Sequence, residues 1–460
     1  MEIPISEIDI LIVFGSIMFL GFIGNYIFNK TQIPSIVWLL LFGLFLGFAF
    51  QIQSFSSLTP ILNYLSGIVG AIAIIVILFD GGINTDIYQL FRGAPRGLLL
   101  TVSGFCLSFI ATLLIVVGLE FSEIIDLGGH SFIIGSILGA IVAGTSSPIV
   151  IPLAYRLKNL QEKTKMVASI ESILTDPICI VVVFAIYYMV FVVGELNLIA
   201  AAGNLVTTFS TGIVLGALFG LIWLFVMNKL RRAQFSYILT LAIVFLVYAA
   251  TVLLVGETNG GGGAGAIACL MFGLVLGNGK KILKMIRYEG KGFEMDEETK
   301  QFHGLTSFVI RTFFFVYLGF IATFQNITFI IVGIVILIVL LLVRYLAVQI
   351  STYNGNFEKD DRQTLTVMMP RGLAAAILAI SFTPLILGPG RNGIPGLDLS
   401  ANMQGLFMDV AFVIILGSAI ITTIGVSIIC HNENKKIKLA EDNTMKDDIE
   451  IISELRKENE

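Results

Sequence analysis

The sequence predicts an all-α polytopic membrane protein with 13 transmembrane helices, two of them broken inside the membrane. Hydrophobic residues make up 56 % of the 460 residues and charged residues only 13 %, where a soluble protein would carry about 25 %. Apolar runs of about 20 residues, enough to cross a bilayer, recur along the whole chain. Three arginines nevertheless lie inside such runs, and a charge at mid-bilayer needs a partner or a function.

The predicted spans follow these apolar runs. They cover residues 7–28, 34–50, 64–82, 97–119, 131–154, 166–191, 205–228, 236–255, 262–279, 305–324, 327–349, 364–387 and 405–429. Residues 1–430 are therefore expected to form one transmembrane domain, and residues 431–460 a short charged tail.

The positions of Lys and Arg predict the orientation. The chain holds 28 of these residues, and setting aside Arg311, Arg344, Arg371 and Arg391 leaves 24. All of these lie in the tail or in connections that follow odd-numbered spans. Because Lys and Arg accumulate on the cytoplasmic side, we expect the N-terminus outside and the C-terminus in the cytoplasm.

The fifth span is predicted to be a broken helix. Pro148 removes a backbone donor and clashes with the preceding turn, and three hydroxyl residues, Thr145, Ser146 and Ser147, stand directly before it. Irregular backbone at membrane depth is tolerated where it lines a cavity. Hydroxyl and freed carbonyl oxygens suit a hard monovalent cation, so we expect these three residues to help bind one.

The twelfth span repeats this arrangement with Pro370, Arg371 and Gly372. Two interrupted helices in separate halves of a chain are typical of transporters built from inverted repeats, whose substrate site lies where the breaks meet. The sequence therefore predicts a transporter in which spans 5 and 12 cross.

Charged side chains of the sixth, eleventh and twelfth spans can be matched by depth. At a rise of about 1.5 Å per residue, Glu171 and Arg344 each lie about five residues from the cytoplasmic end of their spans. Ser147 and Arg371 each lie about seven residues inside. We expect Glu171 and Arg344 to form a structural ion pair. Asp176 lies about ten residues deep without an arginine at its own depth, which marks it as the working group.

Helical spacing places Ser172 on the same face as Asp176, and Thr175 on the same face as Glu171. Ser172 can therefore lend its hydroxyl to a monovalent cation held by Asp176. Burial favours a protonated carboxyl group, and a bound cation favours the carboxylate. One group that holds either a proton or a cation couples their movements by competition.

At these residues the chain resembles the monovalent cation:proton antiporter family, in the NhaP-like branch that includes the eukaryotic sodium/proton exchangers. ESILTDP is similar to the family's sixth-helix motif Glu-Ser-x-x-Asn-Asp, LLVRYLAV to the segment whose arginine pairs with that glutamate, and MMPRGLAAAILAI to the Arg-Gly motif of the second broken helix. The resemblance implies an inverted-repeat antiporter fold. It assigns cation and proton binding to Asp176, a ligand role to Ser172, and helix bridging to Glu171 with Arg344.

Two residues depart from the family pattern. Ser147 stands where the family usually carries Asp before the proline, so Arg371 lacks that anion. Thr175 stands where Asn is usual, and it adds no second titratable group, so we expect electroneutral exchange. Arg311 stands where other branches can carry an acidic residue, and we expect its charge to balance Asp80 in part.

The predicted function is antiport of Na⁺ or Li⁺ for H⁺ across a plasma (inner) membrane, serving pH homeostasis. K⁺/H⁺ antiport is the alternative, because the missing aspartate changes the field strength of the site. A channel or sensor with this fold would be marked by loss of Asp176 or Glu171, and both are present. No hydrolase or metalloprotease motif lies in a span, so neither enzymatic activity nor a cofactor is expected. The expected partners are the transported ions, membrane lipids and a second copy in a homodimer, and not nucleic acid.

Overall fold

The computed structural model describes residues 7–31, 33–52, 59–157, 160–190, 198–229, 236–256, 261–285, 297–322, 324, 326–387 and 405–430. Regular secondary structure within these ranges is helical, as the apolar runs predict. The predicted charged tail and Arg391 lie outside the described residues.

Helices follow one another along the chain with short connections. They are α1 (Glu7–Thr31), α2 (Ser35–Ile52), α3 (Thr59–Ile83), α4 (Ile87–Phe121), α5 (Ser131–Val142), α6 (Ser147–Arg156), α7 (Glu162–Tyr188), α8 (Leu198–Lys229), α9 (Ser236–Val255), α10 (Gly261–Gly277), α11 (Gly279–Met285), α12 (Glu297–Ile321), α13 (Ile327–Thr352), α14 (Lys359–Val367), α15 (Leu373–Leu387) and a final helix, Gly405–Cys430. Eight helices of the described part are long and apolar enough to cross a membrane, or nine if one bent pair is a single span. The all-helical class is confirmed, while the number of 13 crossings stays a prediction.

The interruptions predicted at the fifth and twelfth spans are present. Residues 143–146 separate α5 from α6, and residues 368–372 separate α14 from α15. Pro148 occupies the start of α6, where its missing N–H costs nothing. Proline disfavours helical conformation in the residue before it, which accounts for the end of α14 ahead of Pro370.

Close helix contacts depend on glycine. α10 packs against both α8 and α3, and α2 packs against α12. A Cβ atom on Gly216 of α8 would collide with the Ala268 carbonyl of α10, and one on Gly43 of α2 with the Val316 carbonyl of α12. Because lipid gives these helices no hydrophobic reason to associate, close backbone packing must supply the attraction.

A bend of 78° separates α10 from α11, and no sequence pattern predicted it. Asn278 lies at this bend, and its Nδ2 donates to the carbonyl oxygen of Thr85 at 2.7 Å. Its Oδ1 accepts from the backbone N–H of Ile87 at 3.0 Å. Lys281 of α11 pairs with Asp86 at 2.5 Å. These contacts fasten the end of α10 to the turn between α3 and α4.

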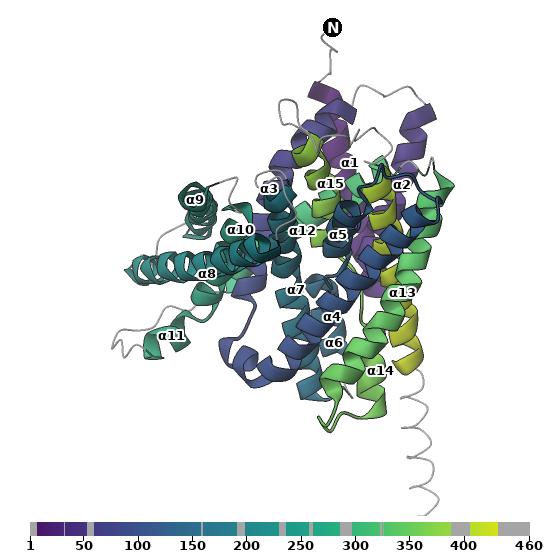
Figure 1. The fold of residues 1–460 in the computed structure, drawn as a ribbon. Helices are drawn as coiled ribbons and strands as arrows, with labels where there is room; N and C mark the ends of the chain where they lie inside the picture. The colour runs from purple at the N-terminus through teal and green to yellow at the C-terminus, as the bar shows by residue number, and fades with distance from the viewer. Residues whose placement is uncertain are drawn as a thin grey trace, which may run out of the picture.

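The broken helices occupy the centre of the bundle, whereas α8 and α9 project to one side of it (Figure 1). The most apolar windows of Ser131–Arg156 and Glu162–Tyr188 are each 67 % buried, against 28 % for Ala202–Lys229 and 22 % for Ser236–Val255. The packed core therefore lies around the helices that carry the predicted site.

Candidate ion-binding site

The two helix breaks touch each other directly. The backbone N–H of Ser146 in the first break donates to the carbonyl oxygen of Pro370 in the second at 2.8 Å. A Cβ atom on Gly372 would collide with the Ser146 side chain, so this approach requires glycine. The crossing thus satisfies one backbone donor that the first break frees, which a bare break at membrane depth could not do.

Arg371 caps the end of the first half-helix. Its side chain is 2 % exposed, and its Nη1 donates to the carbonyl oxygens of Ala143 and of Gly144, the latter at 2.8 Å. These carbonyls follow the end of α5, where no intrahelical partner remains and the negative end of the helix dipole lies. The guanidinium charge is therefore met by backbone dipoles.

Arg344 caps the end of the other half-helix and also meets a carboxylate. Its Nε donates to Leu365 O at 2.9 Å and its Nη2 to Met368 O at 3.0 Å, at the end of α14. The same guanidinium pairs with Glu171 of α7 through two bonds, Nη1 to Oε1 and Nη2 to Oε2, the second at 2.9 Å. The two residues matched by depth in the sequence are thus in contact, and they join α7, α13 and α14.

Thr175 connects α7 to the first break. The backbone N–H of Thr145 donates to Thr175 Oγ1 at 3.1 Å, and Thr175 Oγ1 donates to the Thr145 carbonyl at 3.3 Å. Their hydroxyl oxygens are 3.4 Å apart. Both residues are buried. The threonine that replaces the usual family residue therefore holds the irregular backbone in place.

Asp176 follows Thr175 on the same helix and is buried, with 7 % exposure. In the part of the chain that the structure describes, no hydrogen bond or ion pair of its carboxylate is recorded. Ser172, one turn earlier, donates to Ser169 O at 3.1 Å, which leaves its oxygen able to accept or to ligate. Asp176 thus differs from Glu171, whose charge is already matched by Arg344.

A cavity of about 510 Å³ adjoins the first break and is lined there by Ser146, Ser147 and Pro148. Asp80 of α3 and Arg311 of α12 line the same cavity, close enough for their charges to interact. Asp176 is not among its lining residues. The cavity therefore opens on the hydroxyl side of the break, and Asp80 and Arg311 place one charge of each sign in its lining.

Sequence reasoning missed the atoms that hold Arg371. Depth matching set Arg371 opposite Ser147, whereas its contacts are the carbonyls of Ala143 and Gly144, and the residue packed at the crossing is Ser146. The signal available was the absence of an acidic residue in the first break. This absence shows that an uncharged oxygen must accept from the Arg371 guanidinium, but it does not show which oxygen.

Crossing broken helices beside a buried carboxylate are typical of secondary transporters, in which the substrate site lies where the breaks meet. Residues 15–431 match the family described as sodium/hydrogen exchanger, transmembrane, and the chain belongs to this family. The predicted family is therefore confirmed.

Relatives with described activities share modest identity. The chain is 23 % identical over 423 residues to the K(+)/H(+) antiporter NhaP of Alkalimonas amylolytica, covering 89 % of this chain and 64 % of that protein. It is 27 % identical over 371 residues to Na(+)/H(+) antiporter 1 of Methanocaldococcus jannaschii, covering 80 % and 82 %. The match to Sodium/hydrogen exchanger 8 of Arabidopsis thaliana is 28 % identical, covers 40 % of this chain and spans only 24 % of that protein.

A solved structure has the same fold. The sodium proton antiporter MjNhaP1 from Methanocaldococcus jannaschii, solved at pH 8, superposes with a TM-score of 0.71 at 25 % identity. The match covers 91 % of this chain and all 100 % of that one. The predicted antiporter fold is therefore confirmed.

Proposed function

We propose that this protein exchanges a monovalent cation for protons across a membrane, with Asp176 as the group that carries each in turn. The observation that carries this proposal is the contrast between two neighbouring carboxylates on α7. Glu171 is held by Arg344 in a bidentate pair, whereas no partner of the Asp176 carboxylate is recorded in the described residues. Asp176 is thus the intramembrane carboxylate of α7 that is available to a transported ion.

Coupling follows from competition at one buried group. Without a cation, burial favours the protonated form of Asp176, and a cation bound at the same oxygens displaces the proton. Ser172 supplies a further oxygen, and Thr145, Ser146, Ser147 and Thr175 offer hydroxyls around the first break. Because proton and cation cannot occupy Asp176 together, inward movement of one requires outward movement of the other.

Na⁺ is the proposed cation, with Li⁺ as its smaller analogue. The alternative cation is K⁺, and it is supported by the relatives that are named K(+)/H(+) antiporters. Thr175 brings no second titratable group, so exchange is electroneutral in this proposal. Proteoliposomes loaded with Na⁺, K⁺ or Li⁺ in turn, with and without an imposed potential, distinguish these cases.

The distribution of basic residues supports an orientation with the N-terminus outside and the C-terminus in the cytoplasm. The plasma (inner) membrane stays a prediction. The homodimer stays a prediction from the family resemblance, and native mass spectrometry of the detergent-solubilised protein measures it directly.

The decisive experiment is Asp176→Asn in proteoliposomes that report internal pH. We expect exchange to be abolished with Na⁺, K⁺ and Li⁺, because asparagine cannot take up a proton in place of a cation. Glu162→Gln is the matched control: it removes a carboxylate at the exposed start of the same helix and should leave exchange intact. A purified, monodisperse Asp176→Asn protein that still dissipates a pH gradient on cation addition would overturn the proposal.

A further inference from the structure

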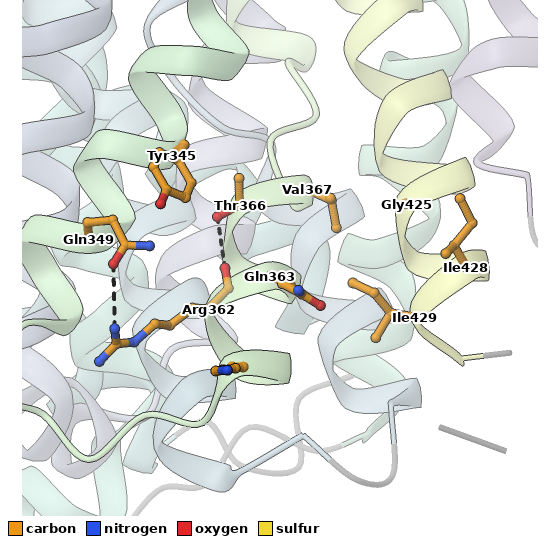
Figure 2. Close-up of a pocket in the computed structure, with 10 residues that line it drawn as sticks. Tyr345, Gln349, Arg362, Gln363, Thr366, Val367, Gly425, Ile428 and Ile429 are labelled. Carbon is orange, nitrogen blue, oxygen red and sulfur yellow. Dashed lines mark hydrogen bonds between the residues drawn. The ribbon is translucent and has the colours of Figure 1, made fainter. Parts of the chain in front are cut away.

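A second cavity lies away from the ion site, between α13, α14 and the helix Gly405–Cys430. Its volume is about 600 Å³. Figure 2 shows Gln349 and Arg362 at one wall and Ile428 and Ile429 of the final helix at the other. None of the residues that line it belongs to the helix breaks or to the proposed ion ligands.

One face of α14 supplies the polar wall. Lys359, Arg362, Gln363 and Thr366 follow one another at helical spacing and all line the cavity. The acidic residues at the start of this helix, Glu358, Asp360 and Asp361, do not line the cavity. Glu358 accepts from Gln161 at 2.9 Å, and Asp361 is buried against the same segment. The basic side chains of this helix, Lys359 and Arg362, therefore line the cavity, and its acidic side chains do not.

The cations in this cavity lack an anion among the described residues. Arg362 reaches Gln349 Oε1 only at 3.5 Å, and its Nε is buried without a hydrogen-bond partner. No ion pair of Arg362 or Lys359 is recorded in that part of the chain. A guanidinium with a buried, unused donor beside an ammonium is suited to an anion with several acceptor oxygens.

The opposite wall and the opening are apolar and face the membrane. Tyr345 of α13 is 53 % exposed and Ile428 of the final helix 55 % exposed, on helices apolar enough to span a bilayer. Gly425 and Ile429 continue the same wall. A ligand bound here would place an anionic group on Lys359 and Arg362 while its hydrocarbon lies along Tyr345 and Ile428.

We infer that this cavity binds the headgroup of an anionic phospholipid from the leaflet on the basic side of the membrane. The Arg362 guanidinium and the Lys359 ammonium contact the phosphate, and Gln349, Gln363 and Thr366 are placed to bond the remaining headgroup oxygens. The lipid joins α13, α14 and the final helix. Because α14 leads into the second helix break, an occupied cavity holds the scaffold of the ion site in place.

Thermal stability of the purified full-length protein in detergent tests this inference, with phosphatidylglycerol as the probe and phosphatidylcholine of the same chains as reference. We expect phosphatidylglycerol to raise the melting temperature and phosphatidylcholine to have little effect. Lys359→Gln with Arg362→Gln should raise the lipid concentration needed for half of this shift by roughly 25-fold, or roughly fivefold for each cation. Lys229→Gln with Lys284→Gln removes the same charge elsewhere and should not change it.

Single changes at the exposed Gln363 keep the test independent of folding. Gln363→Glu should weaken the response to phosphatidylglycerol and Gln363→Lys should strengthen it. An equal shift with inorganic phosphate would overturn the inference in favour of a soluble anion. A response that appears only after removal of residues 431–460 would assign the cavity to the tail instead. Equal loss in the Lys229/Lys284 variant would reduce the effect to general surface charge.

Discussion

The two arginines at the helix breaks are compensated in different ways. Arg344 meets the Glu171 carboxylate and the last carbonyls of α14. Arg371 meets the carbonyls at the end of α5, and its Nε is buried without a hydrogen-bond partner. Both side chains are at most 3 % exposed. The same residue type, at the end of a half-helix in each case, is held once by a hydrogen-bonded carboxylate and once by carbonyl oxygens, and Glu171 attracts Arg371 without a hydrogen bond.

This difference distinguishes the Arg344–Glu171 pair, which fixes the helices, from the helix crossing at Arg371, which among the described residues holds no ion pair with a hydrogen-bonded carboxylate. A bidentate pair between buried charges fixes three helices in one geometry, and loss of either side chain would leave the other charge buried without its partner. The crossing at Arg371 instead retains a positive charge beside the proposed cation site. Where the family usually has a carboxylate, this chain has Ser147, so in the proposed mechanism the local charge depends on Asp176 and on backbone dipoles.

The largest expected effect is at the charge-compensated joint. Glu171→Gln and Arg344→Gln should each destabilise the protein by about 3–5 kcal/mol, because each leaves the other charge buried and unpaired. The double variant should be milder than the sum of the two. Melting temperatures in detergent measure this, and strictly additive losses would show that the pair contributes no coupling.

Arg371→Gln should cost less, about 1–3 kcal/mol, because it leaves carbonyls unsatisfied but strands no charge. Chemical denaturation of Arg371→Gln and Arg344→Gln side by side provides the comparison. A loss as large as that of Arg344→Gln would mean that Arg371 is balanced by an anion after all. Arg371→Lys is the control, since it keeps the charge and one donor.

Ser147→Asp would offer Arg371 a carboxylate, as Glu171 does for Arg344. We expect a coupling of about 1 kcal/mol with Arg371 in a double-mutant cycle with Arg371→Gln. The cycle is needed because an aspartate at the start of α6 also gains from the helix dipole, with or without Arg371. Stability that is independent of Arg371 would show that the new carboxylate does not reach the guanidinium.

Thr175→Val should cost about 1 kcal/mol, because at nearly constant volume it removes one hydroxyl of the first break and leaves the Thr145 N–H without this acceptor. Thr175→Ser keeps the hydroxyl and should be close to the parent protein. Exchange rates measured on both variants separate a ligand role of this hydroxyl from its structural one. Equal exchange by both would limit Thr175 to holding Thr145.

Much of this architecture was accessible from the sequence because its causes are local. Hydropathy located the apolar helices, although α4 begins at Ile87 and α12 at Glu297, ten and eight residues before the predicted spans. Pro148 and Pro370 located both breaks, since proline acts on its own turn. Rise per residue was enough to match Glu171 with Arg344, because two membrane helices share one depth axis. The α10–α11 bend escaped notice, because the contacts of Asn278 come from a distant turn.

By itself, the sequence determined that this is a helical membrane protein of the exchanger family with two interrupted helices. It also indicated a buried carboxylate, Asp176, near the Glu171–Arg344 ion pair. Only the tertiary structure decided that Arg371 rests on Ala143 and Gly144, that Ser146 and not Ser147 packs at the crossing, and that α14 turns its cations into a membrane-facing cavity. The physical reason is that carbonyl acceptors are the same in every residue. The crossing of the helices decides which carbonyl a buried donor reaches, and this cannot be predicted from the types of the residues.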